Sequence, residues 1–328
     1  MPEEAMDFIM NGQAYGSVAQ KMLANSMNIN ALRTNATLRY DEWKIYDTAV
    51  VKACQLRLRG VADLLSRGLE YNIGNGLGKT VLQYEDSSDM TDAEMSMDGI
   101  NRGKGDRIEF TLKYLPLPII HKDFQLNARV LQAGRVTGQP IDTAQAELSA
   151  FKVAEKMEKI LFNGSSDYSF GGGTIYGYLD APNKNSVSLT MDWNDASKTG
   201  ELILADVLAM KQASITARHF GPWILYVPVA YETKLDNEFK TYGVKTIRQR
   251  LLEIDGIQDV KVSDHMTAAH VALVQMTPDT VRMVTGLPVT TVEWQSEGNM
   301  LFHFKVMTIM VPQVRADQNS RSGITILA

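Results

Sequence analysis

The side chains best suited to metal binding or acid–base chemistry are five histidines, at positions 121, 219, 265, 270 and 303. His265 and His270 are five residues apart, whereas a zinc-binding helix places its two histidines four residues apart with a glutamate after the first. The single cysteine, Cys54, lies among Val50, Val51 and Ala53, where a small buried apolar residue is expected rather than a nucleophile. The pattern therefore predicts no metal site and no catalytic residue.

A second candidate for chemistry is the glycine-rich segment 72–80, which ends in Gly78, Lys79 and Thr80 and resembles the end of a phosphate-binding loop. That loop needs a further glycine five positions before the Gly of its Gly-Lys-Thr, where this chain has Ile73, and it joins a strand to a helix. Here a helical pattern precedes and a strand pattern follows. We therefore interpret the glycines as a flexible hinge, and we expect no bound cofactor and no enzyme activity.

Composition sets wider limits. The 328 residues are 45% hydrophobic and 22% charged, which is typical of a globular chain long enough for two structural units. The net charge of -5 argues against sequence-specific DNA binding. One cysteine excludes an intramolecular disulfide and fits a reducing compartment. The most apolar runs, such as Leu115–Ile120, are far shorter than the roughly 20 residues of a membrane span, and the acidic start lacks a secretory signal. We expect synthesis in the cytosol and no membrane contact.

The N-terminal 78 residues are expected to form an arm and a helix. Residues 1–40 are rich in methionine and asparagine and show one narrow helical face at Val18, Met22 and Leu23, so they are interpreted as an arm that must dock on another surface. Residues 41–69 carry apolar side chains at helical spacing, and Gly68 stands near the end. This pattern predicts a helix, bent near Gly60.

Residues 79–115 show the clearest local pattern, a strict alternation that predicts two β-strands. Leu82 and Tyr84 mark the first strand, and Ile108, Phe110 and Leu112 mark the second. Between them lies a tip of about 20 residues, too long for an ordinary compact connection, that holds acidic residues and no basic residue before Arg102. Because a two-stranded ribbon is marginal alone, we expect its apolar side to cover a neighbouring subunit.

The residues expected to make this inter-subunit contact are Leu82, Tyr84, Asp86, Asp89, Asp92, Ile108, Phe110 and Leu112. Acidic side chains at the tip favour a basic partner surface through charge complementarity. The candidate basic partners are Arg33, Arg39, Lys44 and Arg57.

The remainder of the chain alternates between helical and strand patterns. Residues 115–124 are expected to be extended, because their prolines do not fit a regular helix. A long helix is expected over 140–164, with Asp142 as its N-cap. Residues 165–199 are expected to form a loop with one short hairpin. From Gly200 we expect an α/β unit with a helix over 202–210, a strand at 223–228, helices at 231–239 and 247–254, and strands at 260–262, 271–275 and 281–284. A strand over 300–312, and another at 324–327, are expected to rejoin the first unit.

In this order the elements resemble the major capsid protein of tailed bacteriophages, the Hong Kong ninety-seven type, in its encapsulin-like branch. Leu115–Phe124 followed by the 140–164 helix is similar to the ribbon exit and spine helix of that branch. Gly221–Pro228, then Tyr231–Leu235 and Ile247–Ile254, resemble its axial domain. The resemblance covers about residues 70–328 and implies an α+β fold with an N-terminal arm, an extended β-ribbon loop, a peripheral domain with a long spine helix, and an α/β axial domain.

The resemblance also implies domain bounds. They are an arm over 1–40, a helix of the arm and peripheral domain over 41–78, a ribbon over 79–115, a peripheral domain over 116–199, an axial domain over 200–292, and returning strands of the peripheral domain over 293–328. Some members of the family cross-link through lysine and asparagine side chains. Lys79, Lys104 and Lys113 are candidates by position, but no local pattern supports that chemistry.

The implied function is a major capsid protein that self-assembles into the icosahedral shell around a tailed-phage genome. The alternative is an encapsulin-type nanocompartment shell around a protein cargo; the acidic ribbon tip and the arm before Asp41 favour the viral shell. The implied partners are other copies in pentamers and hexamers, scaffold, portal and decoration proteins, and enclosed double-stranded DNA bound without sequence specificity. The expected location is the virion capsid, assembled in the host cytoplasm.

Overall fold

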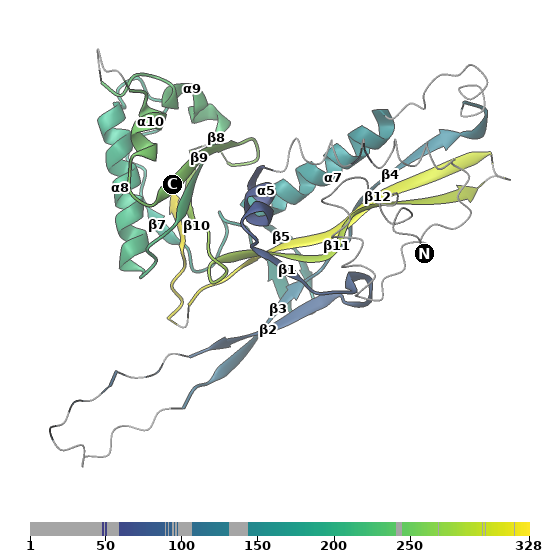
Figure 1. Cartoon of the computed structure of the whole chain (residues 1–328), viewed down its shortest axis with the longest axis horizontal. Coiled ribbons are helices and arrows are strands. Elements are labelled where there is room, and N and C mark those ends of the chain that lie inside the picture. Colours follow the sequence, from purple (N-terminus) through teal and green to yellow (C-terminus); the bar gives the residue numbers. More distant parts are fainter. Residues whose placement is uncertain are drawn as a thin grey trace, which may run out of the picture. The chain divides into compact units, whose positions relative to one another are not determined.

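The chain forms two compact units, each built from separate stretches of sequence (Figure 1). The computed structural model describes residues 48, 50, 59–88, 90, 92–93, 95, 97, 107–130, 144–240, 245–267, 269–296, 298, 300–317 and 319–328. Described residues up to Thr80, together with 117–164 and 282–313, make the first unit. Residues 81–116, 165–281 and 314–328 make the second.

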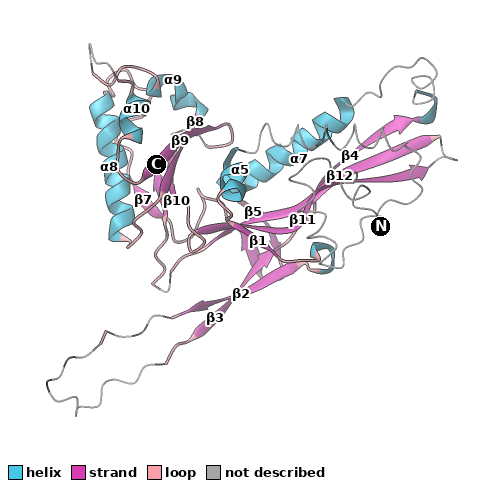
Figure 2. Cartoon of the chain, in the orientation of Figure 1, coloured by secondary structure: helices cyan, strands magenta, loops and turns pink. Residues whose placement is uncertain are grey.

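The first unit is a four-stranded sheet with a long helix packed along one of its edge strands. Its elements are α5 (Arg59–Ser66), β1 (Glu70–Asn72), a 3-10 turn η1 (Gly76–Gly78), β4 (Ile120–Asn127), α7 (Ala144–Asn163), β11 (Val281–Ser296) and β12 (Leu301–Val314). The strand order is β1-β11-β12-β4, as Figure 2 shows. β1 runs parallel to β11, and β12 runs antiparallel to β4.

Helix α7 contacts β4 and α5 and buries a stripe of apolar side chains. Val153, Ala154, Met157 and Leu161 are buried and recur at the three- and four-residue spacing that puts them on one side of a helix. This confirms the long helix expected over 140–164, with described bounds at 144 and 163. The expected N-cap Asp142 lies outside the described residues.

The helix expected over 41–69 is described in part. Residues 48 and 50 are helical, and α5 covers Arg59–Ser66. The chain leaves α5 through Gly68, whose φ of 71° lies in the left-handed region that favours glycine. β1 follows directly, so the helix ends before Leu69.

The second unit contains a five-stranded sheet and two hairpins. Its elements are β2 (Val81–Ser87), β3 (Phe110–Pro116), β5 (Ser165–Phe170), β6 (Gly173–Ile175), β7 (Asn185–Val187), α8 (Gly200–Thr216), β8 (Trp223–Pro228), η2 (Val229–Tyr231), α9 (Glu232–Leu235), α10 (Ile247–Leu252), β9 (Ile257–Ser263), β10 (Val271–Gln275) and β13 (Ile324–Leu327). The large sheet has the order β7-β13-β10-β8-β9, and β2–β3 and β5–β6 pair separately. Among the described residues, no helix is long and apolar enough to cross a membrane.

Two late strands join sheets other than those expected. The strand expected at 281–284 within the axial domain is the start of the 16-residue β11, whose Met283 and Val284 pair with β1 in the first unit. The strand at 324–327, expected to rejoin the peripheral domain, pairs with β10 and β7 in the second unit. All four residues of β13 are buried, as a central strand requires. Alternation reveals a strand but not its partner, which explains both errors.

Smaller differences concern element ends. The helix expected to hold Tyr231, Leu235 and Phe239 ends at Leu235, and the next ends at Leu252 instead of Ile254. Strand β3 begins at Phe110, so Ile108 precedes it. Strand β8 has the expected bounds, and the hairpin expected within 165–199 is β5–β6.

The loop before α8 is fixed to that helix by a buried ion pair. Lys198 Nζ lies 2.6 Å from Asp206 Oδ2, which also accepts a hydrogen bond from Trp193 Nε1 at 2.8 Å. Thr199 caps the helix by accepting from the Leu202 amide at 3.4 Å. Breaking such a pair would leave a buried charge uncompensated, so the pair stabilises the position of this loop on α8.

A carboxyl group is buried where α7 meets the start of α5. Glu158 accepts hydrogen bonds from the amides of Gly60 at 2.8 Å and Val61 at 3.4 Å. Burial, with a smaller contribution from the charge of Asp63, raises the pKa of Glu158 to about 7, while the two amides and Arg59 oppose the rise. The side chain therefore titrates near neutral pH.

We expect this carboxyl group to make stability depend on pH. Between about pH 4.5 and 7 the folded chain keeps a proton that the unfolded chain has lost, so the free energy of unfolding falls as pH rises through that window. The total change is on the order of 3 kcal/mol. Glu158→Gln removes this dependence, measured by urea unfolding of the unassembled protein at pH 4.5 to 7.5. Glu155→Gln, on the same helix with a partly exposed side chain, should keep it; equal slopes in both variants would contradict the assignment.

Candidate assembly surface

The β2–β3 ribbon has two faces of different character. Because residues directly opposite in an antiparallel pair share a face, the register sorts the side chains. Leu82, Tyr84 and Asp86 lie opposite Leu115, Lys113 and Thr111 and form one face. Gln83 and Glu85 lie opposite Tyr114 and Leu112, and Phe110 continues this second face.

The second face presents an exposed apolar stripe. Phe110, Leu112 and Tyr114, called the ribbon stripe below, are 64%, 48% and 38% exposed. On the first face Leu115 is buried and Leu82 and Tyr84 are half-buried. Apolar surface left in water costs roughly 25 cal/mol per Å² relative to its burial, so the ribbon stripe is a surface suited to contact with a partner.

The register divides the residues predicted to make the inter-subunit contact. Leu82, Tyr84 and Asp86 lie on the half-buried face, whereas Phe110 and Leu112 lie on the exposed one. Ile108 and Asp92 are exposed outside the strands. Asp89 and the four candidate basic partners lie outside the described residues. Tyr114 also belongs to the ribbon stripe and continues the alternation of Phe110 and Leu112, although the predicted set did not include it.

Asp86 has a charge partner within the ribbon. Its Oδ2 lies 2.5 Å from Lys113 Nζ, with both side chains partly exposed. A basic side chain from a neighbour would therefore compete with Lys113 for this carboxylate. Lys79, another cross-link candidate by position, donates from Nζ to the carbonyl of Ile73 at 2.7 Å.

Glycines fix the base of the ribbon to the β5–β6 hairpin. A Cβ atom on Gly173 would lie 2.2 Å from the carbonyl oxygen of Tyr114, and one on Gly171 would lie 2.6 Å from Val81 Cγ2. Gly171 also has a φ of 61°, which L side chains rarely adopt. The backbone of the hairpin and that of the ribbon are therefore in direct contact.

The segment 72–80 has a defined local structure. Asn72 Oδ1 accepts from the Gly74 amide at 2.8 Å, and Asn75 Oδ1 accepts from the Gly78 amide at 3.2 Å. A Cβ atom on Gly76 would lie 2.5 Å from Cα of Gly286. Close backbone packing thus explains Gly76, and the asparagine side chains bind the amides of the neighbouring glycines. Close packing and these hydrogen bonds therefore explain the glycines of this segment, in addition to the flexible hinge that the sequence suggested.

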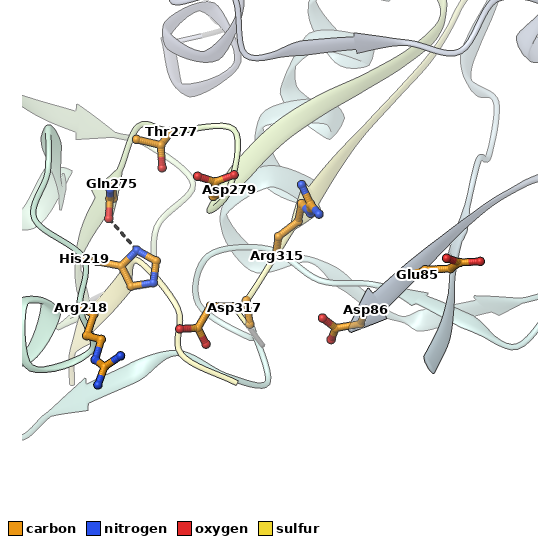
Figure 3. A pocket seen from close by; sticks show the side chains of 10 residues that line it. Glu85, Asp86, Arg218, His219, Gln275, Thr277, Asp279, Arg315 and Asp317 are labelled. Carbon is orange, nitrogen blue, oxygen red and sulfur yellow. Dashed lines mark hydrogen bonds between the residues drawn. The ribbon is translucent and has the colours of Figure 1, made fainter. Parts of the chain in front are cut away.

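A polar cavity of about 440 Å³ lies in the second unit (Figure 3). Its lining is Glu85, Asp86, Arg218, His219, Gln275, Thr277, Asp279, Arg315, Ala316 and Asp317. Gln275 Nε2 donates to the Gly221 carbonyl at 3.0 Å, so its Oε1 accepts from His219 Nδ1 at 2.8 Å. His219, one of the five histidines named above, is the one histidine among these lining residues.

The cavity does not form a recognisable catalytic site. Its carboxylates and guanidinium groups are mixed in sign, and the lining contains no cysteine or serine nucleophile. Within the part of the chain that the structure describes, no three histidine, cysteine, aspartate or glutamate side chains could hold a metal ion. The exposed ribbon stripe is therefore the stronger candidate for function.

Solved structures with the same arrangement of elements are capsids and a virus-like particle. The virus-like particle from Pyrococcus furiosus superposes with a TM-score of 0.62 at 18% identity, over 86% of this chain and 98% of its own. The capsid of Myoviridae phage XM1 superposes with a TM-score of 0.60 at 9% identity, over 76% of this chain and 85% of its own. The protein therefore has the predicted Hong Kong ninety-seven type fold of phage major capsid proteins.

Sequence comparison finds a related shell protein and identifies the family of the chain. It is 24% identical over 226 residues to the type 1 encapsulin shell protein EncA of Myxococcus xanthus, which covers 67% of this chain and 71% of EncA. A model of a family of unknown function, DUF6260, matches residues 11–326. The chain belongs to this family.

We expect Gly173→Ala to weaken the base of the ribbon. Its φ is not in the left-handed region, so alanine would otherwise be neutral or slightly stabilising. The new Cβ would instead press on a main-chain oxygen, and overpacking of this kind costs about 1–3 kcal/mol. Thermal unfolding should show a lower Tm. Thr174→Ala, one residue along β6, is the control, and an unchanged Tm for Gly173→Ala would show that the hairpin does not hold the ribbon.

Proposed function

We propose that this protein is a major capsid protein that self-assembles into the icosahedral shell of a tailed phage. The observation that carries the proposal is the ribbon stripe, an exposed apolar surface on an extended element of a Hong Kong ninety-seven type fold. A subunit that stays monomeric gains nothing from such a surface. A subunit that assembles can cover it with another copy.

Assembly by many small contacts fits these dimensions. A two-stranded ribbon offers each neighbour only a narrow strip, well below the roughly 800 Å² per partner of a standard stable interface. Closed symmetry repeats each contact throughout the particle, so contacts that are weak singly hold a shell together. The ribbon would lie on an adjacent subunit with Phe110, Leu112 and Tyr114 against it.

The two units would correspond to the two domains of related shell proteins. The first unit, with α7 as spine helix, would be the peripheral domain. The five-stranded sheet with α8 and α10 would be the axial domain, placed near the fivefold and sixfold axes. With the observed strand pairing, β13 would belong to the axial domain and β11 to the peripheral domain.

The partners follow from this role. The protein would form pentamers and hexamers, and scaffold, portal and decoration proteins would join them. The net charge of -5 suits an enclosed genome that is retained by the closed wall and not by sequence-specific binding. The particle would be built in the host cytoplasm, with the chain resident in the virion capsid. Such a subunit would have a structural role, which requires no catalysed reaction.

The alternative function is an encapsulin-type shell around a protein cargo. The observation that favours it is the similarity to EncA, whose name describes an encapsulin shell protein. The acidic ribbon tip and the arm before Asp41 favour the phage shell, because the resemblance places both outside the compact encapsulin pattern.

Electron microscopy of the protein expressed alone separates these functions. We expect closed shells or capsomer rings, and diameters well above that of a 60-subunit particle favour the phage shell. Particles that co-purify with a single host protein and little nucleic acid would support the encapsulin alternative. A monodisperse monomer at every concentration and salt, with and without co-expressed neighbouring genes, would refute shell formation.

The ribbon stripe gives a second prediction. Phe110→Asp with Leu112→Asp should reduce particle yield at least tenfold, because two carboxylates would be desolvated at the contact, yet leave the Tm of the unassembled chain within about 2 °C, because both side chains are exposed. Sedimentation and circular dichroism measure the two effects. Phe110→Leu with Leu112→Met keeps the surface apolar and should assemble. Normal yield from the aspartate variant would rule out the ribbon stripe as a contact.

A further inference from the structure

The two units of this chain differ in charge. Among the described residues, the first unit has ten lysine and arginine side chains and seven aspartate and glutamate side chains. In the described part of the second unit acidic side chains outnumber basic ones, as they do in the chain as a whole. A local excess of positive charge on an acidic protein indicates a surface that can meet a negatively charged partner.

The exposed basic side chains of the first unit include a row along α7. Lys152, Lys156 and Lys159, called the lysine row below, are all exposed. Because a helix turns by about 100° per residue, Lys156 and Lys159 lie within about 40° of Lys152. The buried Ala154 and Leu161 lie on the opposite side of the helix. The lysine row therefore faces away from the core of its own unit.

Little acidic charge opposes the lysine row. Glu155, at its edge, pairs with Lys152 at 2.7 Å, and the two side chains are 35% and 60% exposed. An exposed pair of this kind contributes little to stability, so Lys152 stays available to another anion. Glu147, in the first turn of α7, is exposed but lies about 140° round the helix from Lys152. Lys156 and Lys159 form no ion pair with the residues that the structure describes, so their charges are uncompensated there.

The chemistry of the lysine row fits the phosphate backbone of duplex DNA. A lysine ammonium is a compact charge with three donors, and it pairs with a phosphate without a fixed orientation. From Lys152 to Lys159 the helix rises by about 10 Å. Duplex DNA carries a phosphate charge about every 1.7 Å along its axis, so the three ammonium groups can contact separate phosphates. Contacts made to phosphates alone carry no sequence information.

Three phosphate contacts give weak binding by one subunit. Each contact releases roughly 0.9 counterion from duplex DNA, so the binding constant should fall with salt with a logarithmic slope of about -2.7. Closed symmetry would repeat the row on every copy, and many weak sites acting together hold a long polymer more firmly than one site does. A shell with this surface inside would retain a layer of DNA along its wall, while each single contact breaks readily.

We propose that the lysine row of α7 binds the phosphate backbone of the enclosed duplex DNA, which places the outer side of α7 on the inner surface of the shell. This inference rests on the proposed phage-shell function and adds to it the surface at which the wall meets the genome. The row lies on the first unit and shares no residue with the ribbon stripe, so DNA binding and assembly can be changed separately.

The test replaces the row in the full chain by Lys152→Gln, Lys156→Gln and Lys159→Gln. Fluorescence anisotropy of unassembled subunits with a labelled duplex of random sequence measures binding between about 50 and 200 mM salt. The parent should show a slope of about -2.7, and the row variant should bind at least tenfold more weakly with a slope near zero. Because all three side chains are exposed, the Tm should stay within about 2 °C of that of the parent.

Two triple variants serve as controls. One removes the same charge from the second unit and should keep the slope of the parent; its changes are Lys234→Gln, Lys240→Gln and Lys245→Gln. The other keeps the charge of the row and should bind DNA like the parent; its changes are Lys152→Arg, Lys156→Arg and Lys159→Arg. A parent slope in the first control, together with a lost slope in the row variant, would assign DNA binding to α7.

The outcomes separate this inference from the function on which it depends. If the parent never forms shells, the shell proposal fails, and the inner placement of α7 fails with it. If shells form and the row variant binds DNA with the affinity and slope of the parent, the shell proposal stands and the lysine row is refuted.

Two further results would overturn the inference. Binding of polyglutamate as tight as that of duplex DNA would indicate an acidic protein partner for the lysine row. Closed parent shells that bind added duplex through the row would show that the row lies outside, whereas the inference expects the row variant and the parent to bind added duplex equally once the shell is closed.

Discussion

Apolar surface that the described elements leave exposed is the constraint on which this structure depends. The chain has enough hydrophobic residues to fill two cores, yet it leaves Phe110, Leu112 and Tyr114 on the ribbon and Leu202 and Leu208 on α8 in contact with water. These positions are on regular elements whose other sides are well packed, so a rearrangement that hid them would expose the core. A neighbouring copy that covered them would recover the free energy that their exposure costs.

Rigid supports hold these surfaces in place. Backbone-to-backbone packing at Gly173 fixes the ribbon base on a hairpin, and a buried Lys198–Asp206 pair fixes the loop that leads into α8. In each case a polar or glycine residue lies where an apolar side chain could not serve, because the contact is to main chain or to a charge. The apolar surfaces are thus held in a fixed conformation before assembly, which lowers the entropic cost of binding.

The sequence was sufficient to predict the main helices and strands and the fold, but it did not show which strands pair with one another. Alternation at 80–84 and 108–114 predicted the ribbon, and helical spacing predicted α7 and α8. The resemblance of ordered segments then predicted the Hong Kong ninety-seven type fold. The faces of the ribbon needed the register, because Leu82 and Phe110 belong to equally regular patterns yet lie on opposite sides. β13 and the start of β11 were assigned to the wrong sheets because four-residue apolar strands fit any buried position. The basic partners proposed for the acidic tip fall outside the described residues, so that pairing stays a prediction.

The interleaving of the two units in the sequence has a consequence for synthesis. In the first unit β1 pairs with β11 and β4 pairs with β12, and in the second unit β13 lies between β7 and β10. Neither sheet can be completed while the ribosome has yet to release the last quarter of the chain. A prematurely terminated polypeptide thus lacks the central strands of both sheets and presents no finished surface to other copies. The order of the strands thus makes the completion of both sheets depend on the synthesis of residues 281–327.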